Sequence, residues 1–230
     1  MDFNRSPHTR STFGPGTCLS ELDAASLDAI INAAVRRAVK KGQIVCLEGE
    51  PCPGLIIIES GWIQGVKVSP QGREQELSLA GPGEMINEIS IMAGEFNILT
   101  LRTVESSIIW IIKLEIILEL MVKHPILSNI ITQNMAKRIV HLINIVEDLA
   151  LRNVEGRLAN MLLNFSKSNP IQNHHWSTRE EIASRIGTTS VVISRVLHEM
   201  EDQGAIYLKG HEIHILNHQM LEAVAFREYK

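Results

Sequence analysis

Three patterns of hydrophobic and polar positions follow one another along the chain. Residues 20–39 carry apolar residues at helical spacing, and Ser20 precedes them as a candidate N-cap, so this segment is predicted to be a helix. From Lys41 to Lys113 short β-branched or alternating runs are separated by glycine and proline. Such runs predict strands, and residues 70–72 (Pro-Gln-Gly) predict a hairpin turn. Strands of this length and spacing favour a small antiparallel roll.

After Leu114 the pattern becomes helical again. A first helix, LEIILELMVKH, is expected to stop before Pro125, because the residue before a proline disfavours the helical conformation. A long helix follows, from about residue 125 to 151, and its apolar side chains step by four and three residues as in a two-stranded coiled coil. The helix packs either on its own roll or on a second chain, and we expect both contacts. The seam assigned to a dimer interface consists of Met135, Ile139, Leu142, Val146 and Leu149.

The C-terminal third is predicted to be a separate compact unit. Asn153 is a candidate N-cap for a new helix, which makes residues 151–153 a candidate hinge. Beyond a polar loop at 169–175, two helices, two short strands and a closing helix near 218–228 are expected.

The segment from Thr178 to Glu201 has the spacing of a helix-turn-helix. Ala183 is small where two helices would cross, Gly187 follows four residues later in the turn, and Ile193 follows six residues after that. The strand pair AIYLKG/HEIHIL then predicts a wing, and the second helix is expected in the major groove of DNA. Polar residues on this helix, at the helix starts and on the wing are the candidate DNA contacts. They are Arg179, Thr188, Thr189, Ser190, Val191, Ser194, Arg195 and Lys209.

Charge limits the kind of DNA binding. The 230-residue chain has a net charge of −4, which excludes a globally basic protein. Residues 151–230 hold about nine basic and nine acidic residues, so a sequence-specific dimer with few phosphate contacts is favoured over a nonspecific coat. Two copies would bind half-sites about 34 Å apart. The competing interpretation is a purely structural helix pair.

Over nearly its whole length after about residue 20, the chain resembles the cyclic-AMP receptor protein and fumarate-nitrate regulator superfamily of bacterial transcription regulators. The resemblance is carried by residues 40–84 of the roll, by QNMAKRIVHLINIVEDLALRNVEGRLA on the long helix, and most specifically by TREEIASRIGTTSVVISRVLHEMEDQGAI. It implies an α+β fold: an N-terminal antiparallel β-roll of the cupin-like, cyclic-nucleotide-binding type, a long dimerisation helix and a C-terminal winged helix-turn-helix. The expected segments are a flexible tail (1–19), a sensing roll (20–124), the dimer helix and hinge (125–152) and a DNA-binding domain (153–230).

The resemblance weakens at the expected effector site. Relatives that bind cyclic nucleotides carry a Gly-Glu pair and, about ten residues later, an Arg-Ser pair, because arginine neutralises the cyclic phosphate and glutamate takes the ribose hydroxyl. Here Asn87 replaces the glycine, Glu88 is retained, and Ile98-Leu99 stand where Arg-Ser is expected. A phosphate against two apolar side chains would be desolvated without a partner, so cyclic AMP is not expected as the effector. The candidate pocket comprises Trp62, Asn87, Glu88, Ile98, Leu99, Leu142 and Ile143.

Other sensors of this superfamily also fit the sequence poorly. An iron–sulfur centre needs a cluster of cysteines, and the spacing of Cys18, Cys46 and Cys52 does not provide one. Haem-binding members place a histidine at the position of Ile89. No metal site or cofactor is predicted. Three alternatives remain: an unknown small hydrophobic effector, a pocket filled by its own side chains, or a redox disulfide between Cys46 and Cys52.

The DNA-reading helix departs from the family at one position. Ser194 and Arg195 match the serine-arginine pair of the fumarate-nitrate branch, and Arg195 is expected to bind guanine. Val191 stands where family members typically carry a glutamate that accepts from cytosine, so a different preference is expected there, such as contact with a thymine methyl.

Together these features predict a homodimeric, sequence-specific transcription regulator that binds palindromic double-stranded DNA, with RNA polymerase as a further partner. The alternative is a ligand-binding or scaffolding protein whose winged helix contacts other proteins. No enzyme activity is expected, because no nucleophile–base pair is visible and the His174-His175 pair has no third ligand. A cytoplasmic location is expected, since no signal-peptide pattern and no apolar run of about 20 residues occurs.

Overall fold

The structure, a computed structural model, describes residues 17–94, 96–167, 178–210 and 212–226. Contacts divide the chain into two units, residues 1–67 with 78–140 and residues 68–77 with 141–230, and each is described by itself. Helix α5 (Pro125–Leu151) contributes to both units. Within the described residues, no helix is long and apolar enough to cross a membrane.

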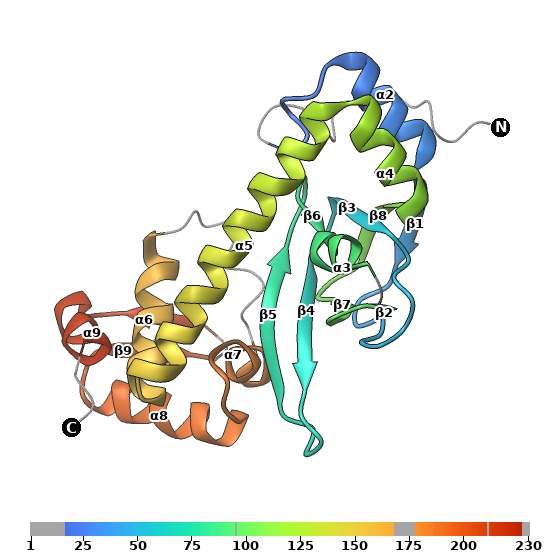
Figure 1. The fold of residues 1–230 in the computed structure, drawn as a ribbon. Helices are drawn as coiled ribbons and strands as arrows, with labels where there is room; N and C mark the ends of the chain where they lie inside the picture. Colours follow the sequence, from blue (N-terminus) through green and yellow to red (C-terminus); the bar gives the residue numbers. More distant parts are fainter. Residues whose placement is uncertain (1–16, 95, 168–177, 211, 227–230) are drawn as a thin grey trace. The chain divides into compact units, whose positions relative to one another are not determined.

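The strands of the N-terminal region form two four-stranded sheets, with the orders β1-β8-β3-β6 and β2-β7-β4-β5 (Figure 1). The paired strands are antiparallel, as in the predicted roll. Their bounds are Val35–Val39, Ile44–Cys46, Leu55–Ser60, Ile63–Val68, Glu74–Ala80, Met85–Ile86, Thr100–Thr103 and Ser107–Ile112 for β1 to β8.

The core of the first unit lies around the apolar runs of β3 and β8. The side chains buried there include Leu55, Ile57, Trp110 and Ile112. Each of the two strands has apolar residues on both of its faces, so both faces can be covered by other parts of the protein. Helices pack against one side of this core: α2 (Ala24–Ala33), α3 (Glu88–Ala93), α4 (Leu114–Lys123) and the first turns of α5.

The predicted helix over residues 20–39 is wrong at both ends. Helix α2 begins at Ala24, and its N-cap is Asp23 rather than Ser20, because the Asp23 carboxylate accepts a hydrogen bond of 2.7 Å from the Ser26 amide. The helix ends at Ala33, and residues 35–39 form β1, which is the edge strand of its sheet and pairs with β8. Backbone pairing with a neighbouring strand therefore outweighs the helical spacing of the local sequence.

The other strand predictions are confirmed, with ends shortened by up to three residues. The Pro70–Gly72 turn is also confirmed: Gly72 has a φ of 79°, and the Ser69 and Arg73 backbones are hydrogen bonded across it. Strand β6 and helix α3 were not predicted from the sequence. They meet at Asn87, whose φ of 80° makes it a non-glycine residue in the left-handed region.

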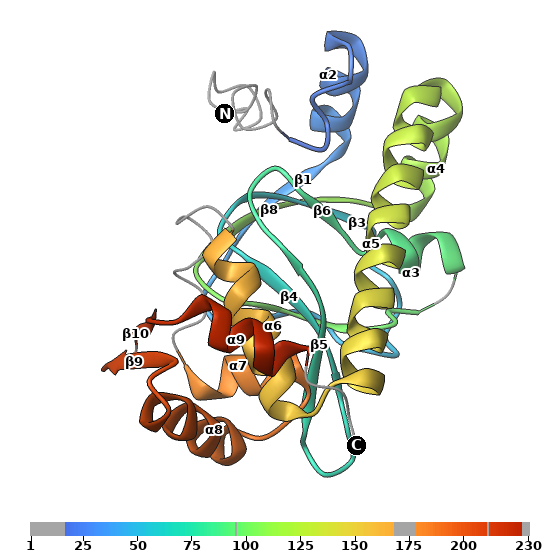
Figure 2. The same ribbon diagram turned by 90° about the vertical axis from the view of Figure 1, so that its left-hand side faces the viewer.

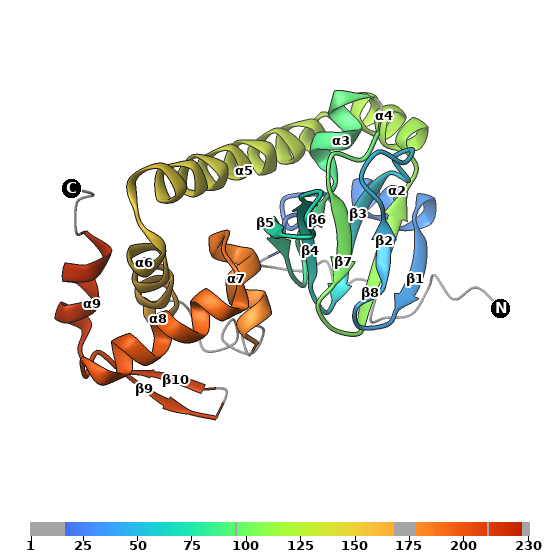
Figure 3. The ribbon, with the colours of Figure 1, turned by 90° about the horizontal axis from the view of Figure 1, so that it is seen from below.

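The second unit contains the predicted helices and wing. Besides the end of α5 and the start of β5, it contains the helices α6 (Val154–Lys167), α7 (Arg179–Ile186), α8 (Ser190–Asp202) and α9 (His218–Ala225) and the strands β9 (Ile206–Lys209) and β10 (Glu212–Ile215). Figure 2 shows α9 lying along α6, and Figure 3 shows the β9–β10 hairpin beside the end of α8. One core of buried side chains, which includes Leu158, Ile182, Ile193, Leu197 and Leu221, joins the four helices.

Two predicted boundaries agree with local hydrogen bonds. Asn153 caps α6, since its side-chain oxygen accepts a bond of 2.7 Å from the Gly156 amide. Helix α4 ends at Lys123 and α5 begins at Pro125, as the proline predicts.

One predicted segment lies wholly outside the described residues, and another lies mostly outside them. The polar loop at 169–175 is one, and residues 1–16 of the predicted tail are the other. Of the last tail residues, Leu19 is 1% exposed and belongs to the core of the first unit.

Candidate functional site

The helix-turn-helix is fixed by its turn. Helix α7 ends at Ile186 and is capped by Gly187, which has a φ of 72°; the amides of Gly187 and Thr188 both bond to the carbonyl of Ala183. A left-handed residue is needed at this point, and glycine adopts that conformation without strain. Thr189 then caps α8 by accepting a bond of 3.4 Å from the Val192 amide. The predicted spacing of Ala183 and Gly187 therefore matches a real turn.

The inner face of α8 holds the helix against α7 and the wing. Ile193, Val196, Leu197 and Met200 are buried in the core. The carboxylate of Glu201 accepts a bond of 2.7 Å from the Leu208 amide, which ties the end of α8 to β9. Because one face is packed in this way, the opposite face of α8 is fixed toward solvent.

The outer face of α8 carries most of the predicted DNA contacts. Val191 and Arg195 are 77% and 69% exposed, and Ser190 and Ser194 are half-buried beside them. The Arg195 guanidinium lies 3.8 Å from the Glu199 carboxylate, an exposed pair that contributes little to stability. The predicted contacts outside this face are exposed or half-buried, and they are Arg179, Thr188, Thr189 and Lys209.

One residue of the outer face was missed by sequence reasoning. His198 lies one turn beyond Ser194, is exposed, and its Nδ1 lies 2.6 Å from the Ser194 carbonyl oxygen. Its spacing of four from Ser194 is the signal that would have placed it on this face.

The retained Glu88 of the roll is engaged by the protein itself. Its side chain is 1% exposed, and its Oε1 accepts hydrogen bonds from Asn134 (2.9 Å) and from Arg138 Nε (3.2 Å). Arg138 also donates to the carbonyl oxygens of Leu79 and Met85. The arginine on α5 therefore joins β5, β6 and the start of α3. The second oxygen of Glu88, Oε2, is buried and has no hydrogen-bond partner among the described residues.

Arg138 and Asn134 were missed by sequence reasoning. They lie four residues apart on α5 and so share one face of the helix, off the apolar seam. The available signal was Arg138 itself, a positively charged residue on the side of α5 that otherwise contributes apolar contacts to the roll.

The remaining predicted pocket residues in the first unit are held by internal contacts. The Asn87 amide nitrogen lies 3.1 Å from the Gly54 carbonyl oxygen and 3.2 Å from Asn97 Oδ1. Leu99 packs against the roll core, and the Trp62 ring lies against Gly81, where an added Cβ would come within 2.7 Å of it. In the second unit, Leu142 is half-buried and Ile143 is 58% exposed.

The predicted seam of α5 is mostly exposed. Ile139, Val146 and Leu149 are 55%, 64% and 42% exposed, and Leu142 is half-buried. Met135 differs, because it packs against the core of the first unit. These exposed apolar side chains therefore lie outside the packed cores of the single chain.

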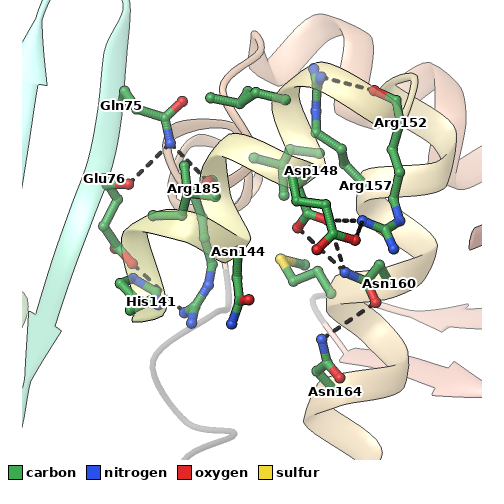
Figure 4. A pocket seen from close by; sticks show the side chains of 15 residues that line it. Gln75, Glu76, His141, Asn144, Asp148, Arg152, Arg157, Asn160, Asn164 and Arg185 are labelled. Carbon is green, nitrogen blue, oxygen red and sulfur yellow. Dashed lines mark hydrogen bonds and ion pairs between the residues drawn. The ribbon is translucent and has the colours of Figure 1, made fainter. Parts of the chain in front are cut away.

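A cavity of about 290 Å³ lies in the second unit, lined by the start of β5 and by α5, α6 and α7 (Figure 4). The Gln75 amide donates to the Arg185 carbonyl oxygen at 3.0 Å, and the Glu76 carboxylate lies 3.7 Å from the Arg185 guanidinium. Burial raises the pKa of Glu76 to about 7, although the charge of Arg185 opposes the shift. On the far wall, Asp148 accepts bonds from Arg152 and Asn160. Sequence reasoning gave no sign that the start of β5 takes part.

The three cysteines are free thiols. Burial raises the pKa of Cys18 and of Cys46 to about 12, and it also raises the pKa of Cys52. Thiols with such values are protonated near neutral pH and react slowly. Among the described residues, no cluster of three or more histidine, cysteine, aspartate or glutamate side chains is arranged to hold a metal ion.

Two family profiles match the chain. The cyclic nucleotide-binding domain matches residues 36–124, and the Crp-like helix-turn-helix domain matches residues 156–224. Among characterised proteins, the chain is 29% identical over 213 residues to the fumarate and nitrate reduction regulatory protein of Vibrio cholerae, covering 90% of this chain and 84% of that protein. It is 27% identical over 187 residues to the CRP-like cAMP-activated global transcriptional regulator of Mycobacterium tuberculosis, covering 79% and 84%. These relatives are transcription regulators and not enzymes, in agreement with the expectation from sequence.

Solved structures give the same result for the fold. A chain from Eubacterium rectale, described as a transcriptional regulator of the crp/fnr family, superposes with a TM-score of 0.74 at 25% identity and covers 93% of this chain and 98% of its own. A c-di-GMP-responsive global regulator from Xanthomonas campestris superposes with a TM-score of 0.76 at 21% identity, covering 85% of this chain and 100% of its own.

Proposed function

Because the chain belongs to the Crp/Fnr superfamily of bacterial transcription regulators, we propose that it acts as a homodimer that binds palindromic DNA through α8. We propose further that cyclic AMP is not its effector. The observation that carries the first proposal is the outer face of α8, where Arg195 and its neighbours are held toward solvent by a fully packed inner face.

The chemistry of the outer face suits base reading in the major groove. Arginine binds the O6 and N7 acceptors of guanine in a bidentate manner, and serine bonds to bases or phosphates. The exposed Arg195 has only a 3.8 Å contact with Glu199 to give up, so engaging DNA requires little reorganisation. Lys209, exposed at the end of β9, is placed to contact a phosphate of the backbone.

The exposed stripe of α5 supports the dimer. Val146 and Leu149 follow the heptad spacing and are exposed in the single chain, so pairing with a second α5 would remove them from water. Burial of several such side chains, at roughly 25 cal/mol per Å² of apolar area, favours association. A dimer would also place two copies of α8 on two half-sites of a palindrome.

The argument against cyclic AMP rests on the site at Glu88. The carboxylate that a ribose hydroxyl would use is already bonded to Arg138 and Asn134. The predicted phosphate positions, Ile98 and Leu99, offer no side-chain donor to an anion. An effector of another class would have to donate a hydrogen bond to the remaining Glu88 oxygen, or bind elsewhere in the protein. These contacts also agree with a roll that needs no ligand.

As a regulator of this type, the protein is expected to work in the cytoplasm, where it would reach chromosomal DNA and RNA polymerase. Both expectations follow from the proposed function.

The test is DNA-site selection with the purified full-length chain, followed by fluorescence anisotropy at several salt concentrations. We expect one palindromic sequence, whose affinity falls as salt rises because phosphate contacts release counterions. Val146→Glu should yield a monomer in sedimentation and a large loss of affinity. Val122→Glu, at a valine that is 82% exposed on α4 and off the seam, is the matched control and should leave both unchanged.

Two results would contradict the proposal. Failure to select any sequence would favour the alternative of a scaffolding protein whose winged helix contacts other proteins. A rise in DNA affinity on adding cyclic AMP would refute the statement about the effector.

A further inference from the structure

Val191 lies outside the packed core of the second unit. It is 77% exposed, whereas the other apolar residues of α8 are buried or half-buried. It stands on the first turn of the helix, two residues after the Thr189 cap. Valine is also a poorer helix former than alanine by roughly half a kcal/mol, so helix stability does not explain its presence.

The same turn carries the groups that the proposed function assigns to base reading. Val191 is one turn before Arg195 and three residues before Ser194, so the three side chains share the outer face. N-terminal residues of a recognition helix face base edges in the major groove. The C5-methyl of thymine is the apolar group that this groove displays, and valine offers it two methyl groups and no competing polar atom.

We infer that Val191 is a specificity-determining residue that selects thymine through its methyl group, an inference that rests on the proposed function. The geometry also limits where that thymine lies. Residues four apart on a helix are separated by about 6 Å along its axis, and neighbouring bases are about 3.4 Å apart. The selected thymine is therefore one or two base pairs from the guanine that Arg195 binds, in each half-site.

The experiment removes the methyl group from the DNA and from the protein in turn. Each thymine of the selected half-site is replaced by deoxyuridine, which differs from thymine by the methyl group alone, and affinities are measured for the full-length wild-type chain and for Val191→Ala. For the wild type, deoxyuridine at one position should weaken binding about three- to fivefold for each half-site that carries it, the effect of losing one buried methyl group. Deoxyuridine at the other thymines is the control and should have no effect.

The variants decide whether Val191 is responsible. Val191→Ala should bind the thymine site about as weakly as the wild type binds the deoxyuridine site, and it should show no further loss with deoxyuridine. Val191→Glu should move the preference at this position from thymine toward cytosine, whose amino group a carboxylate accepts. Both substitutions are at an exposed position, and circular dichroism should show unchanged folding.

The inference and the proposed function fail in different ways. If no sequence is selected, the proposed function is refuted and the inference falls with it. If a palindrome is selected but no deoxyuridine weakens binding, or if Val191→Ala retains the deoxyuridine effect, the regulator binds DNA without reading this methyl group and the inference alone is wrong.

Discussion

The roll site at Glu88 and the outer face of α8 differ in how their charged side chains are buried and bonded. Glu88 is 1% exposed and is bonded by Arg138 and Asn134, whereas Arg195 is 69% exposed with one distant ionic neighbour. A buried charge must be compensated from within the protein, because removing it from water costs several kcal/mol. An exposed charge remains solvated and is available to a partner at little cost.

The contrast teaches where each site can respond to its surroundings. At Glu88 a ligand that needs the bonded oxygen would have to displace an arginine that bonds to that carboxylate and to two backbone carbonyls. On α8 the reading side chains are already oriented by the packing beneath them, so DNA meets a formed surface. The first site therefore favours internal stabilisation, and the second favours recognition.

The largest expected effect comes from removing the internal partner in the roll. Arg138→Ala would leave Glu88 buried with Asn134 as its remaining donor, so we expect a loss of about 3–5 kcal/mol in the free energy of unfolding. Urea denaturation at a fixed protein concentration measures this loss. The fixed concentration matters, because the stability of a dimer depends on it.

A double substitution provides the control. Glu88→Leu with Arg138→Met removes both charges and retains most of the volume, so most of the lost stability should return. If Arg138→Ala costs less than 1 kcal/mol, Glu88 is not held by a buried pair, and the contrast between the two regions fails.

The second effect concerns the exposed region. Arg195→Ala should leave the free energy of unfolding within about 0.5 kcal/mol of the wild type, as for most exposed positions. Its affinity for the selected palindrome should fall by about 1–3 kcal/mol per half-site, and discrimination at the guanine should disappear. Anisotropy with the selected site and with single-base variants measures both quantities.

Lys209→Ala separates base reading from phosphate binding. Loss of a phosphate contact should weaken binding to all sequences alike and lower the salt dependence by about one counterion. Unchanged base preference in Arg195→Ala would mean that Arg195 does not read the guanine.

The sequence predicted the second unit better than the first. Its helices and wing follow from local signals: a cap at Asn153, a left-handed turn at Gly187, and apolar spacing that matches a helix packed on one face. These signals act over a few residues, so they can be recognised without knowledge of the fold. The Val191–Arg195 face follows directly from the same spacing.

The first unit depends on contacts that are distant in sequence. Residues 35–39 become a strand because they pair with β8, about seventy residues later, and Arg138 meets Glu88 across fifty residues. Local spacing contains no record of either contact. The same holds for Gln75 and Glu76, whose hydrogen bond and ion pair with Arg185 join residues about 110 positions apart.

The smallest expected effect tests whether the second unit also holds a buried charge. Glu76 is 6% exposed, and burial raises its pKa to about 7, while Arg185 opposes the shift and Glu181 adds to it. Since the folded pKa lies above the ordinary value of 4.5, the folded state retains a proton that the unfolded chain releases. The stabilising contribution of this group is therefore full below pH 4.5 and is lost as the pH rises toward 7. Between pH 6 and 7 the loss should be on the order of 1 kcal/mol.

Denaturation of Glu76→Gln should lack this fall in stability with pH, and Glu74→Gln, on the same strand but less buried, should retain it. An identical slope in both variants would show that Glu76 is solvated, and the buried charge would then be confined to the roll.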